Sequence, residues 1–257
     1  MLVTLNEVTV SYTDKKILDN VSFSINDNDK IGIVGINGTG KSTLLKTILG
    51  EVDIQSGEIF RKSGLKIAYL PQQPKFDENA SIIDTALKES KVDNEYEIKA
   101  MLSKLGIDNL DSKISTLSGG EKRRLALAIT LVKQCDLLIL DEPTNHLDIW
   151  MINWLEKYLT KWSKALLLVT HDRYFLERIT NKTLDMELGN VYLYDVNYSN
   201  YLNLKVERAE YQQANYRKLK AILKKEAAWA ALNPQARSTK STERLKRYYE
   251  LEDKTNK

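Results

Sequence analysis

The chain has 257 residues, of which 42% are hydrophobic and 28% charged, with a net charge of +3. This composition is ordinary for a soluble globular protein with one large domain, or one domain with an appendage. No apolar run approaches the ~20 residues that a membrane-spanning helix needs, and the first residues lack the features of a signal peptide. The single Cys135 cannot form an internal disulfide, so we expect a reducing, cytoplasmic location.

The charge is unevenly distributed along the chain. Residues 205–257 contain 14 Lys or Arg and 7 Asp or Glu, whereas residues 1–204 contain 24 and 28. A basic end on a mildly acidic body indicates a polyanionic partner for that end. The alternative is a solvated helical face, and charge alone does not decide between the two.

The first 35 residues predict β-strands. The segments "LVTLNEVTV" and "ILDNVSFSI" are rich in strand-forming residues, and the turn-like "TDKK" separates them. A second turn, "NDND", precedes the short apolar run "KIGIV". Residues 44–49 then predict a helix that stops at Gly50.

Between that apolar run and that helix lies "GINGTGKS", residues 35–42, which fits the phosphate-loop pattern G-x-x-x-x-G-K-[ST]. Glycines let backbone N–H groups turn toward phosphate oxygens, and the helix N-terminus adds partial positive charge. We expect Lys41 to reach the β- and γ-phosphates of ATP and Ser42 to hold Mg²⁺. A chance match is the alternative, and the strand–loop–helix context disfavours it. The loop residues expected at the nucleotide are Gly35, Asn37, Gly38, Gly40, Lys41, Ser42 and Thr43.

The segment "LSGGEKRR" predicts the start of a long amphipathic helix. Ser118 is a good N-cap, and a Ser-Gly-Gly turn at a helix start is a further place for an anion. Ser118, Gly119 and Gly120 are therefore candidate nucleotide contacts, although a capped helix start is common by itself.

The segment "CDLLILDEPTNHLD" predicts a buried strand, Leu137 to Leu140, that ends in two carboxylates. Ligands of open α/β sheets bind at such strand ends. Asp141 suits the Mg²⁺ shell, and Glu142 suits the polarisation of an attacking water. Because neighbouring side chains on a strand point to opposite faces, we expect different roles for them. The alternative, two carboxylates that cap the next helix, is disfavoured by the phosphate loop.

Taken in order, these motifs resemble the ATP-binding cassette ATPases throughout residues 1–196. The resemblance rests on the phosphate loop, "YLPQ" with Gln72, "LSGG", "LILDEP", "NHLD" and His171 in "LVTHDR". It implies an α/β fold with a phosphate-loop core sheet, an antiparallel β subdomain at the start and a helical subdomain at about 75–130. It also implies a cassette domain at 1–197, followed by a basic helical linker at 198–257.

The resemblance further implies roles for single residues. Tyr12 matches the aromatic residue that stacks on adenine, Gln72 the glutamine that senses Mg²⁺ and water, and His171 the histidine that contacts the γ-phosphate. Asp148 matches the aspartate of the dimer contact. Taken singly, Tyr12 also fits a core tyrosine and Gln72 an ordinary loop residue. In this family two cassettes sandwich ATP between the phosphate loop of one and the Ser-Gly-Gly turn of the other, which implies a second cassette or a second copy as partner.

Several segments resemble the soluble ABC-F family, which acts on ribosomes. They are "DEPTNHLD", "DIWMINWLEKYL", "LVTHDRYFLERI" and "YDVNYSNYLNLK". Transporter cassettes more often carry Ser-Ala or similar where Asn145 and His146 stand. From about Tyr198 the chain predicts a long basic helix with apolar residues at 3–4 spacing, which Asn233-Pro234 interrupts. A returning helix would complete an antiparallel α-helical hairpin.

The predicted hairpin combines basic side chains with aromatic ones such as Trp229, a combination that suits RNA phosphates and stacked bases. Its segment "PQARSTKSTER" resembles the linker tip of ABC-F proteins, especially Uup-type members, in which the hairpin reaches toward tRNA and the ribosomal catalytic centre. The alternative is a coiled linker that only spaces two cassettes. The cations expected to contact nucleic acid are Arg237, Lys240, Arg244, Lys246 and Arg247.

We therefore expect an ABC-F-type ATPase that binds Mg-ATP, closes on a second cassette and couples closure to the ribosome or tRNA. One rival is the ATPase subunit of a membrane transporter, although nothing in the sequence asks for a membrane subunit. The other is an ATP-dependent clamp on DNA, which the resemblance to Uup-type proteins leaves open. The chain looks like the first half of a longer protein. Only 45 residues separate Gln72 from Ser118, too few for the long helical arm of many ABC-F first cassettes.

Overall fold

The computed structural model describes residues 1–12, 15–92, 94–230, 243–247 and 249. It divides into two units, residues 1–199 and residues 200–257. We call the first unit the body and the second the tail.

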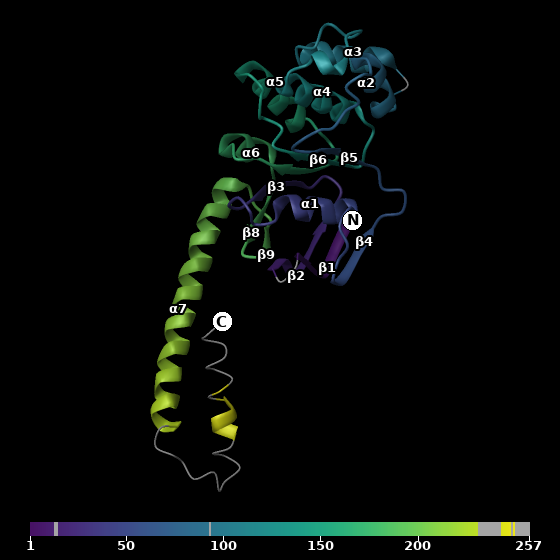
Figure 1. Ribbon diagram of the computed structural model, residues 1–257. Coiled ribbons are helices and arrows are strands. Elements are labelled where there is room, and N and C mark those ends of the chain that lie inside the picture. The colour runs from purple at the N-terminus through teal and green to yellow at the C-terminus, as the bar shows by residue number, and fades with distance from the viewer. Residues whose placement is uncertain (13–14, 93, 231–242, 248, 250–257) are drawn as a thin grey trace. The chain divides into compact units, whose positions relative to one another are not determined.

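A six-stranded sheet forms the centre of the body (Figure 1). Its strands follow the order β5-β6-β7-β3-β8-β9, and every neighbouring pair is parallel except β8 and β9. All residues of β6 and β7 are buried, which explains why they are continuous apolar runs, and the predicted buried strand is confirmed. In sheet order the strands are β5 (Ile67–Leu70), β6 (Leu137–Asp141), β7 (Ala165–Val169), β3 (Lys30–Val34), β8 (Lys182–Glu187) and β9 (Asn190–Tyr194).

A smaller antiparallel sheet is built mostly from the start of the chain. It has the order β2-β1-β4, with β1 at Val3–Tyr12, β2 at Lys15–Ile25 and β4 at Ser56–Arg61. In its register Val3 lies opposite Ile25 on one side and Arg61 on the other. The predicted N-terminal strands are therefore confirmed.

Helix α1 (Lys41–Leu49) shares one apolar core with both sheets. Its Leu44, Leu45 and Ile48 are fully buried in that core together with residues of β1, β2 and β3. Gly50 ends the helix in the left-handed conformation, at φ 82°, as predicted. The helix begins at Lys41, earlier than the predicted residue 44, because the phosphate loop leads directly into its first turn.

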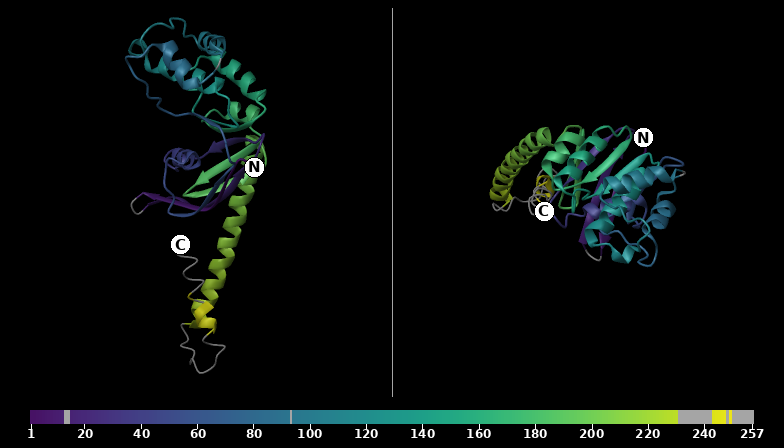
Figure 2. Two further views of the ribbon diagram at one scale, coloured as in Figure 1. Left: turned by 90° about the vertical axis from the view of Figure 1, so that its right-hand side faces the viewer. Right: turned by 90° about the horizontal axis from the view of Figure 1, so that it is seen from above.

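The helical subdomain lies at the end of the body opposite the antiparallel sheet, as Figures 1 and 2 show. Ser118 caps α4 in a full capping box with Glu121, so the predicted N-cap is confirmed. Two further helices, α5 (Ile149–Thr160) and α6 (Arg173–Ile179), follow β6 and β7 along the chain. The elements of the subdomain are α2 (Ile82–Ser90), α3 (Glu95–Lys104), the 3₁₀ turn η1 (Ile114–Thr116) and α4 (Gly119–Val132).

Strand β6 joins two hydrophobic cores. Leu138 and Leu140 pack into the core of the helical subdomain, α5 and α6. Leu137 and Ile139 pack into the core of α1 and the antiparallel sheet. Because successive side chains of a strand point to opposite faces, one short segment anchors both halves of the body. The loop that follows β6 is thus carried by a rigid element.

The tail begins within α7 (Tyr198–Ala230), a continuous helix of 33 residues (Figure 1). At 1.5 Å per residue it is about 50 Å long. Residues 243–247 are helical as well, and the Arg244 guanidinium donates to Glu226 Oε2 at 2.7 Å and lies 4.2 Å from the centre of the Trp229 ring. The second helical segment therefore lies beside α7, as the predicted hairpin requires. Asn233, Pro234, Arg237 and Lys240 lie outside the described residues.

No helix within the described ranges is both long and apolar enough to cross a bilayer.

Candidate active site

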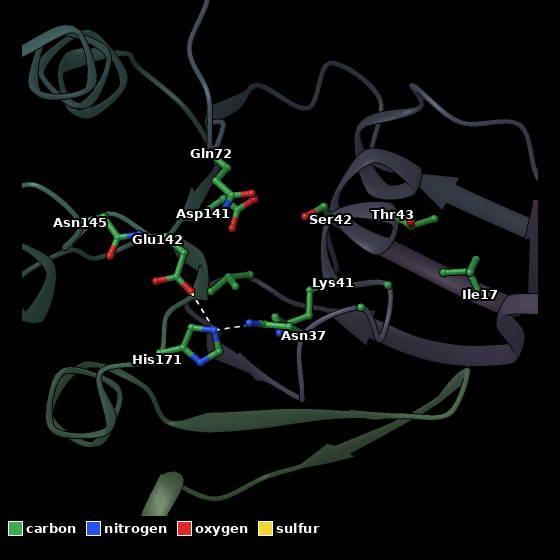
Figure 3. A pocket seen from close by; sticks show the side chains of 13 residues that line it. Ile17, Asn37, Lys41, Ser42, Thr43, Gln72, Asp141, Glu142, Asn145 and His171 are labelled. Atoms are coloured by element: carbon green, nitrogen blue, oxygen red, sulfur yellow. Dashed lines mark hydrogen bonds and ion pairs between the residues drawn. The ribbon is translucent and has the colours of Figure 1, made fainter. Parts of the chain in front are cut away.

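Four loops meet at one edge of the core sheet. They follow β3, β5, β6 and β7, which are neighbours in the sheet and run parallel, so their carboxyl ends lie side by side. The loops enclose a cavity of about 500 Å³, a typical size for a small-molecule site (Figure 3). Its lining residues are Ile17, Asn37, Gly38, Gly40, Lys41, Ser42, Thr43, Gln72, Asp141, Glu142, Asn145, Val169 and His171.

The phosphate loop supplies one wall of the cavity. Gly40 has φ 98°, and a Cβ there would clash with Ile17, so the turn into α1 requires glycine. The Lys41 ammonium donates to the carbonyl oxygens of Gly35 at 2.7 Å and Ile36 at 3.1 Å. Burial lowers the pKa of Lys41, and the charges of Glu142 and Asp141 oppose that shift. The ammonium is thus held within reach of anything that enters the cavity.

Asp141 and Glu142 supply the opposite wall. Asp141 ends β6, and Glu142 has φ 53°, so the chain leaves the strand between them. Both side chains line the same cavity, which corrects the expectation that they would point to opposite faces. Strand alternation does not extend through a residue in the left-handed region. Burial and the neighbouring Glu142 raise the pKa of Asp141, and Arg123 and Lys41 oppose this.

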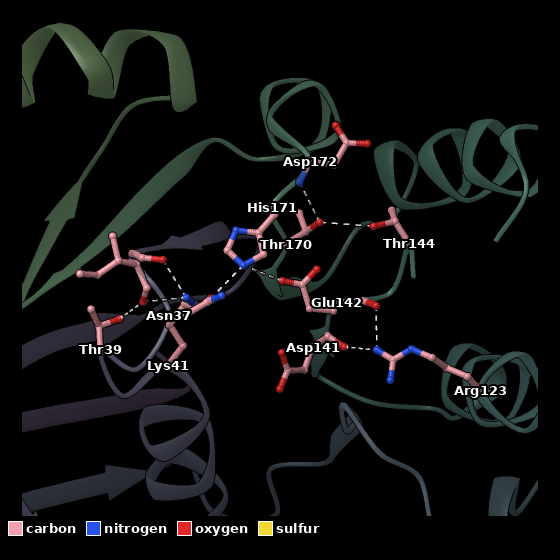
Figure 4. A network of polar contacts seen from close by, with 12 residues as sticks. Asn37, Thr39, Lys41, Arg123, Asp141, Glu142, Thr144, Thr170, His171 and Asp172 are labelled. Carbon is pink, nitrogen blue, oxygen red and sulfur yellow. Dashed lines mark hydrogen bonds and ion pairs between the residues drawn. The ribbon is translucent and has the colours of Figure 1, made fainter. Parts of the chain in front are cut away.

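His171 connects two of the loops (Figures 3 and 4). Its Nε2 lies 3.1 Å from Oδ1 of Asn37 in the phosphate loop and 3.6 Å from Oε1 of Glu142. The imidazole is well exposed, whereas the Glu142 side chain is nearly buried. The histidine therefore lies where it can contact both a ligand in the phosphate loop and the carboxylate beside it.

The oxygen ligands of the cavity suit a small divalent cation. Ser42, Gln72 and Asp141 contribute a hydroxyl, an amide and a carboxylate to the lining. Across the described residues there is no cluster of three or more His, Cys, Asp or Glu side chains that could hold a metal alone. Mg²⁺ is usually bound by one or two carboxylates together with substrate phosphates and water, so this sparse set fits it.

Six of the residues predicted for the nucleotide site lie outside the cavity lining. Ser118, Gly119 and Gly120 form the start of α4, and an added Cβ at Gly119 would meet nothing within 4 Å. Asp148 caps α5 by accepting from the Met151 amide at 2.8 Å. Tyr12, at the end of β1, is half exposed. Gly35 contributes through its carbonyl bond to Lys41 rather than as a lining residue.

The structure also adds residues that the sequence did not single out. Ile17 of β2 provides an apolar contact beside the phosphate loop, and Asn145 and Val169 complete the lining. Asn145 belongs to the segment "DEPTNHLD", so the sequence did point to its position. Ile17 is an ordinary residue of a strand, and nothing in its sequence context marks it. Arg123 lies behind the cavity and donates to the carbonyls of Asp141 and Glu142 (Figure 4).

Three of the predicted nucleic-acid residues lie in the described tail. Lys246 and Arg247 are exposed. Arg244 is already bonded to both carboxylate oxygens of Glu226 and lies over Trp229. Arg237 and Lys240 fall on residues that the structure does not describe.

Two family models match the chain, both described as ABC transporter. The first covers residues 18–145, and an extension model covers residues 184–257. Together they include the cavity loops from the phosphate loop to Asn145 and the whole tail.

Proteins similar to this chain belong to the same class. A Bacillus subtilis protein described as "Uncharacterized ABC transporter ATP-binding protein YfmR" is 37% identical, over 95% of this chain and 46% of that protein. Energy-dependent translational throttle protein EttA of Mycobacterium tuberculosis is 33% identical, over 96% and 52%. ATP-binding protein Uup of Buchnera aphidicola is 35% identical, over 96% and 43%. The chain thus spans about half the length of these relatives.

The fold agrees with solved structures of the same class. An ATP-binding subunit of an ABC transporter superposes with a TM-score of 0.68 at 23% identity, over 76% of this chain and 90% of that one. The phosphate loop, the core sheet with its antiparallel and helical subdomains, and the cavity define an ATP-binding cassette ATPase domain. The matched extension and the relatives at half length show that the chain belongs to the ABC-F family within that class.

Proposed function

We propose that this chain is one half of an ABC-F ATPase, in which residues 1–197 form an ATP-binding cassette and residues 198–257 a linker that acts on the translation machinery. The observation that carries the proposal is the meeting of Lys41, Ser42, Asp141, Glu142 and His171 in one cavity. These residue types in this arrangement supply positioning and charge neutralisation, which phosphoryl transfer requires.

ATP binding in this proposal depends on the phosphate loop. The triphosphate lies along the loop amides and the N-terminus of α1, where the helix dipole favours negative charge. Lys41 exchanges the carbonyl oxygens of Gly35 and Ile36 for phosphate oxygens. Tyr12, although outside the cavity lining, provides an exposed ring for the adenine.

Hydrolysis depends on the opposite wall of the cavity. Ser42, Asp141 and Gln72 would hold Mg²⁺, which neutralises charge on the phosphate oxygens when bound. Glu142 orients and polarises the attacking water. His171 contacts the γ-phosphate, and its present bonds to Asn37 and Glu142 keep it at the mouth of the cavity.

The site needs a second cassette. Ser118, Gly119 and Gly120 lie outside the cavity of their own chain, and the turn they form at the start of α4 is open to a ligand from elsewhere. In the proposed assembly this turn covers the ATP of the partner cassette, and Asp148 contacts the partner. A cassette that follows this chain in a longer protein, or a second copy, provides the missing turn.

The tail supplies the connection to translation. One relative is named an energy-dependent translational throttle protein. The similarity to it covers 96% of this chain and so includes both the body and the tail. Lys246 and Arg247 are exposed and suit a phosphate backbone, as do Arg237 and Lys240 by their charge. Arg244 contacts Glu226 and Trp229 of α7, so its part in the proposal is to hold the two helical segments together.

Co-sedimentation with ribosomes tests this function. The Glu142→Gln protein, which binds ATP without turning it over, is pelleted with ribosomes at two salt concentrations, with and without ATP. We expect ATP-dependent binding that weakens with salt, because phosphate contacts release counterions. Changing Arg237, Lys240, Lys246 and Arg247 to Gln should abolish the pelleting. Lys99→Gln and Lys122→Gln, which remove two ion-paired lysines of the body, are the control.

The outcomes separate the rival functions. Pelleting that is indifferent to ATP and to the four tail cations would contradict the proposal. Binding of branched DNA under the same conditions, without ribosome binding, would identify a DNA clamp. Recovery only with membranes would identify a transporter subunit.

A further inference from the structure

Arg123 is a buried cation to which the proposed function gives no role. It lies on α4, five residues after Ser118, and is only 6% exposed. Among the described residues its guanidinium has no carboxylate within salt-bridge distance. Burial lowers the pKa of this guanidinium, and the negative charges of Asp141 and Glu142 oppose the shift. An arginine remains charged in such a place, so the protein holds a full positive charge behind the cavity.

The guanidinium donates hydrogen bonds to the main chain of two cavity loops, of which Figure 4 shows the loop after β6. Its Nη2 donates to the carbonyl oxygens of Asp141 at 2.6 Å and Glu142 at 2.7 Å. Its Nη1 donates to the carbonyl oxygen of Gln72, with a longer contact to Pro71. One planar group thus connects the loop after β5 with the loop after β6. A lysine ammonium, as a single point, lacks the fork that reaches both loops.

The loop after β6 needs such support. Glu142 occupies the left-handed region at φ 53°, a conformation that costs a non-glycine residue free energy and persists only where neighbours fix it. Its amide donates to the Val169 carbonyl at 2.8 Å, and its own carbonyl accepts from Arg123. The residue is therefore held on both sides of its strained backbone, with its carboxylate in the cavity.

Fold stability alone does not explain an arginine at this position. The Nε–H of Arg123 is buried and has no hydrogen-bond partner in the described structure. An unsatisfied buried donor lowers the free energy of unfolding, which offsets part of what the bonds to the carbonyls contribute. The guanidinium also fixes the geometry of the two loops relative to each other.

We infer that Arg123 is a positioning residue for hydrolysis, which sets the main chain of Gln72 and Glu142 so that their side chains meet the attacking water. The inference rests on the proposed ATPase function. Arg123 bonds neither Lys41 nor any other residue of the phosphate loop, so its loss should affect hydrolysis and ATP binding differently. Loss of the guanidinium should lower kcat and leave the affinity for Mg-ATP nearly unchanged.

Single-turnover hydrolysis and equilibrium binding of Mg-ATP test the inference on the protein assembled with its second cassette. Arg123→Met should lower the hydrolysis rate about 10- to 100-fold, the cost of a misplaced catalytic group. Its Kd for Mg-ATP should stay within about threefold of the wild type. The hydrolysis rate of Arg123→Lys should lie between those of Arg123→Met and the wild type. The control is Lys122→Met on the same helix, where the lysine pairs only with the exposed Glu78, and wild-type rates are expected.

Amide hydrogen exchange of the nucleotide-free chain gives a second readout that needs no turnover. Arg123→Met should exchange faster at the amides of residues 72 and 73 and of residues 142, 144 and 145, with β7 unchanged. Wild-type hydrolysis by Arg123→Met, or unchanged exchange in both loops, would overturn the inference. If Glu142→Gln is inactive while Arg123→Met is fully active, only this inference fails. If Glu142→Gln turns over normally, the proposed hydrolytic site fails with it.

Discussion

The body and the tail place their charged groups in opposite surroundings. In the body, Asp141 and Glu142 are less than a tenth exposed and Arg123 is buried behind them. In the tail, Lys246 and Arg247 are exposed, and the pair of Arg244 with Glu226 lies at the surface. Buried charges act through fixed geometry, and exposed ones through a field that salt screens.

The difference explains which parts of the function tolerate change. In the body, backbone turns of Gly40 and Glu142 aim each group, so single substitutions should have large effects. In the proposed function several tail cations share one task, so single substitutions there should have small effects and only combined changes large ones.

Replacement of the body carboxylate should have the largest effect. Glu142→Gln keeps the shape of the side chain and removes the charge that polarises water, so we expect kcat to fall on the order of 10²- to 10⁴-fold. Binding of Mg-ATP, measured with a fluorescent analogue, should be retained. Full turnover in this variant would remove Glu142 from its role.

Truncation of one apolar side chain in each unit should lower the free energy of unfolding by very different amounts. Leu138 is fully buried in β6, so Leu138→Ala should lower the free energy of unfolding of the body by about 2–5 kcal/mol. Ile222 of α7 is 45% exposed, so Ile222→Ala should stay within about 0.5 kcal/mol. Urea unfolding followed by circular dichroism measures both. Equal losses of unfolding free energy in the two variants would contradict this expectation, because Ile222 would then pack into a core as Leu138 does.

Loss of the phosphate-loop ammonium should weaken nucleotide binding without unfolding the body. Lys41→Ala removes charge-assisted hydrogen bonds to phosphate, for which we expect an increase of Kd for Mg-ATP of about 10- to 100-fold. Lys46→Ala, which changes an exposed lysine in the last turn of the same helix, serves as the control. Unchanged binding in Lys41→Ala would count against the phosphate-loop assignment.

The tail ion pair should give the smallest effect, and a local one. The hydrogen bond from Arg244 holds the pKa of Glu226 below its usual value, so the pair is formed at neutral pH. A carboxyl group with a lowered pKa stabilises the fold above its unfolded pKa, near 4.5, and loses this contribution as the pH falls through the lowered value. Glu226→Gln should therefore speed amide exchange at residues 243–247 at pH 7 and leave the melting of the body unchanged. Exchange at residues 243–247 that stays slower than in Glu226→Gln even when the pH is well below the lowered pKa of Glu226 would contradict this reading.

Much of the fold and the chemistry of the site could be predicted because local sequence carries it. The phosphate loop is specified by Gly40 and Lys41, which have few alternatives at their positions. The short apolar run Leu137 to Leu140 favoured a strand buried on both faces, which the structure confirms. The start of α4 was readable because Ser118 and Glu121 satisfy each other across one helical turn.

Contacts between distant segments could not be predicted. Ile17 meets Gly40 only because β2 folds against the loop, and its apolar side chain carries no signal of this. Arg123 looked like one more charge at the start of a helix, and its burial follows from the packing of α4 near the ends of β5 and β6. The opposite-face expectation for Asp141 and Glu142 failed because the left-handed turn at Glu142 is set by its bonds to Val169 and Arg123.

We propose that one chain binds ATP with its own cavity loops but supplies only half of a hydrolytic site. The direct test of this proposal is the ATPase activity per chain, measured at rising concentrations of the second cassette or of the chain itself. Gly119→Asp is the decisive variant, because a Cβ there would meet nothing within 4 Å and, in the proposed assembly, the carboxylate would face the partner's phosphates. We expect ATPase activity that rises with partner concentration and is abolished by Gly119→Asp while ATP binding persists. Activity per chain that is independent of concentration and indifferent to Gly119→Asp would contradict it.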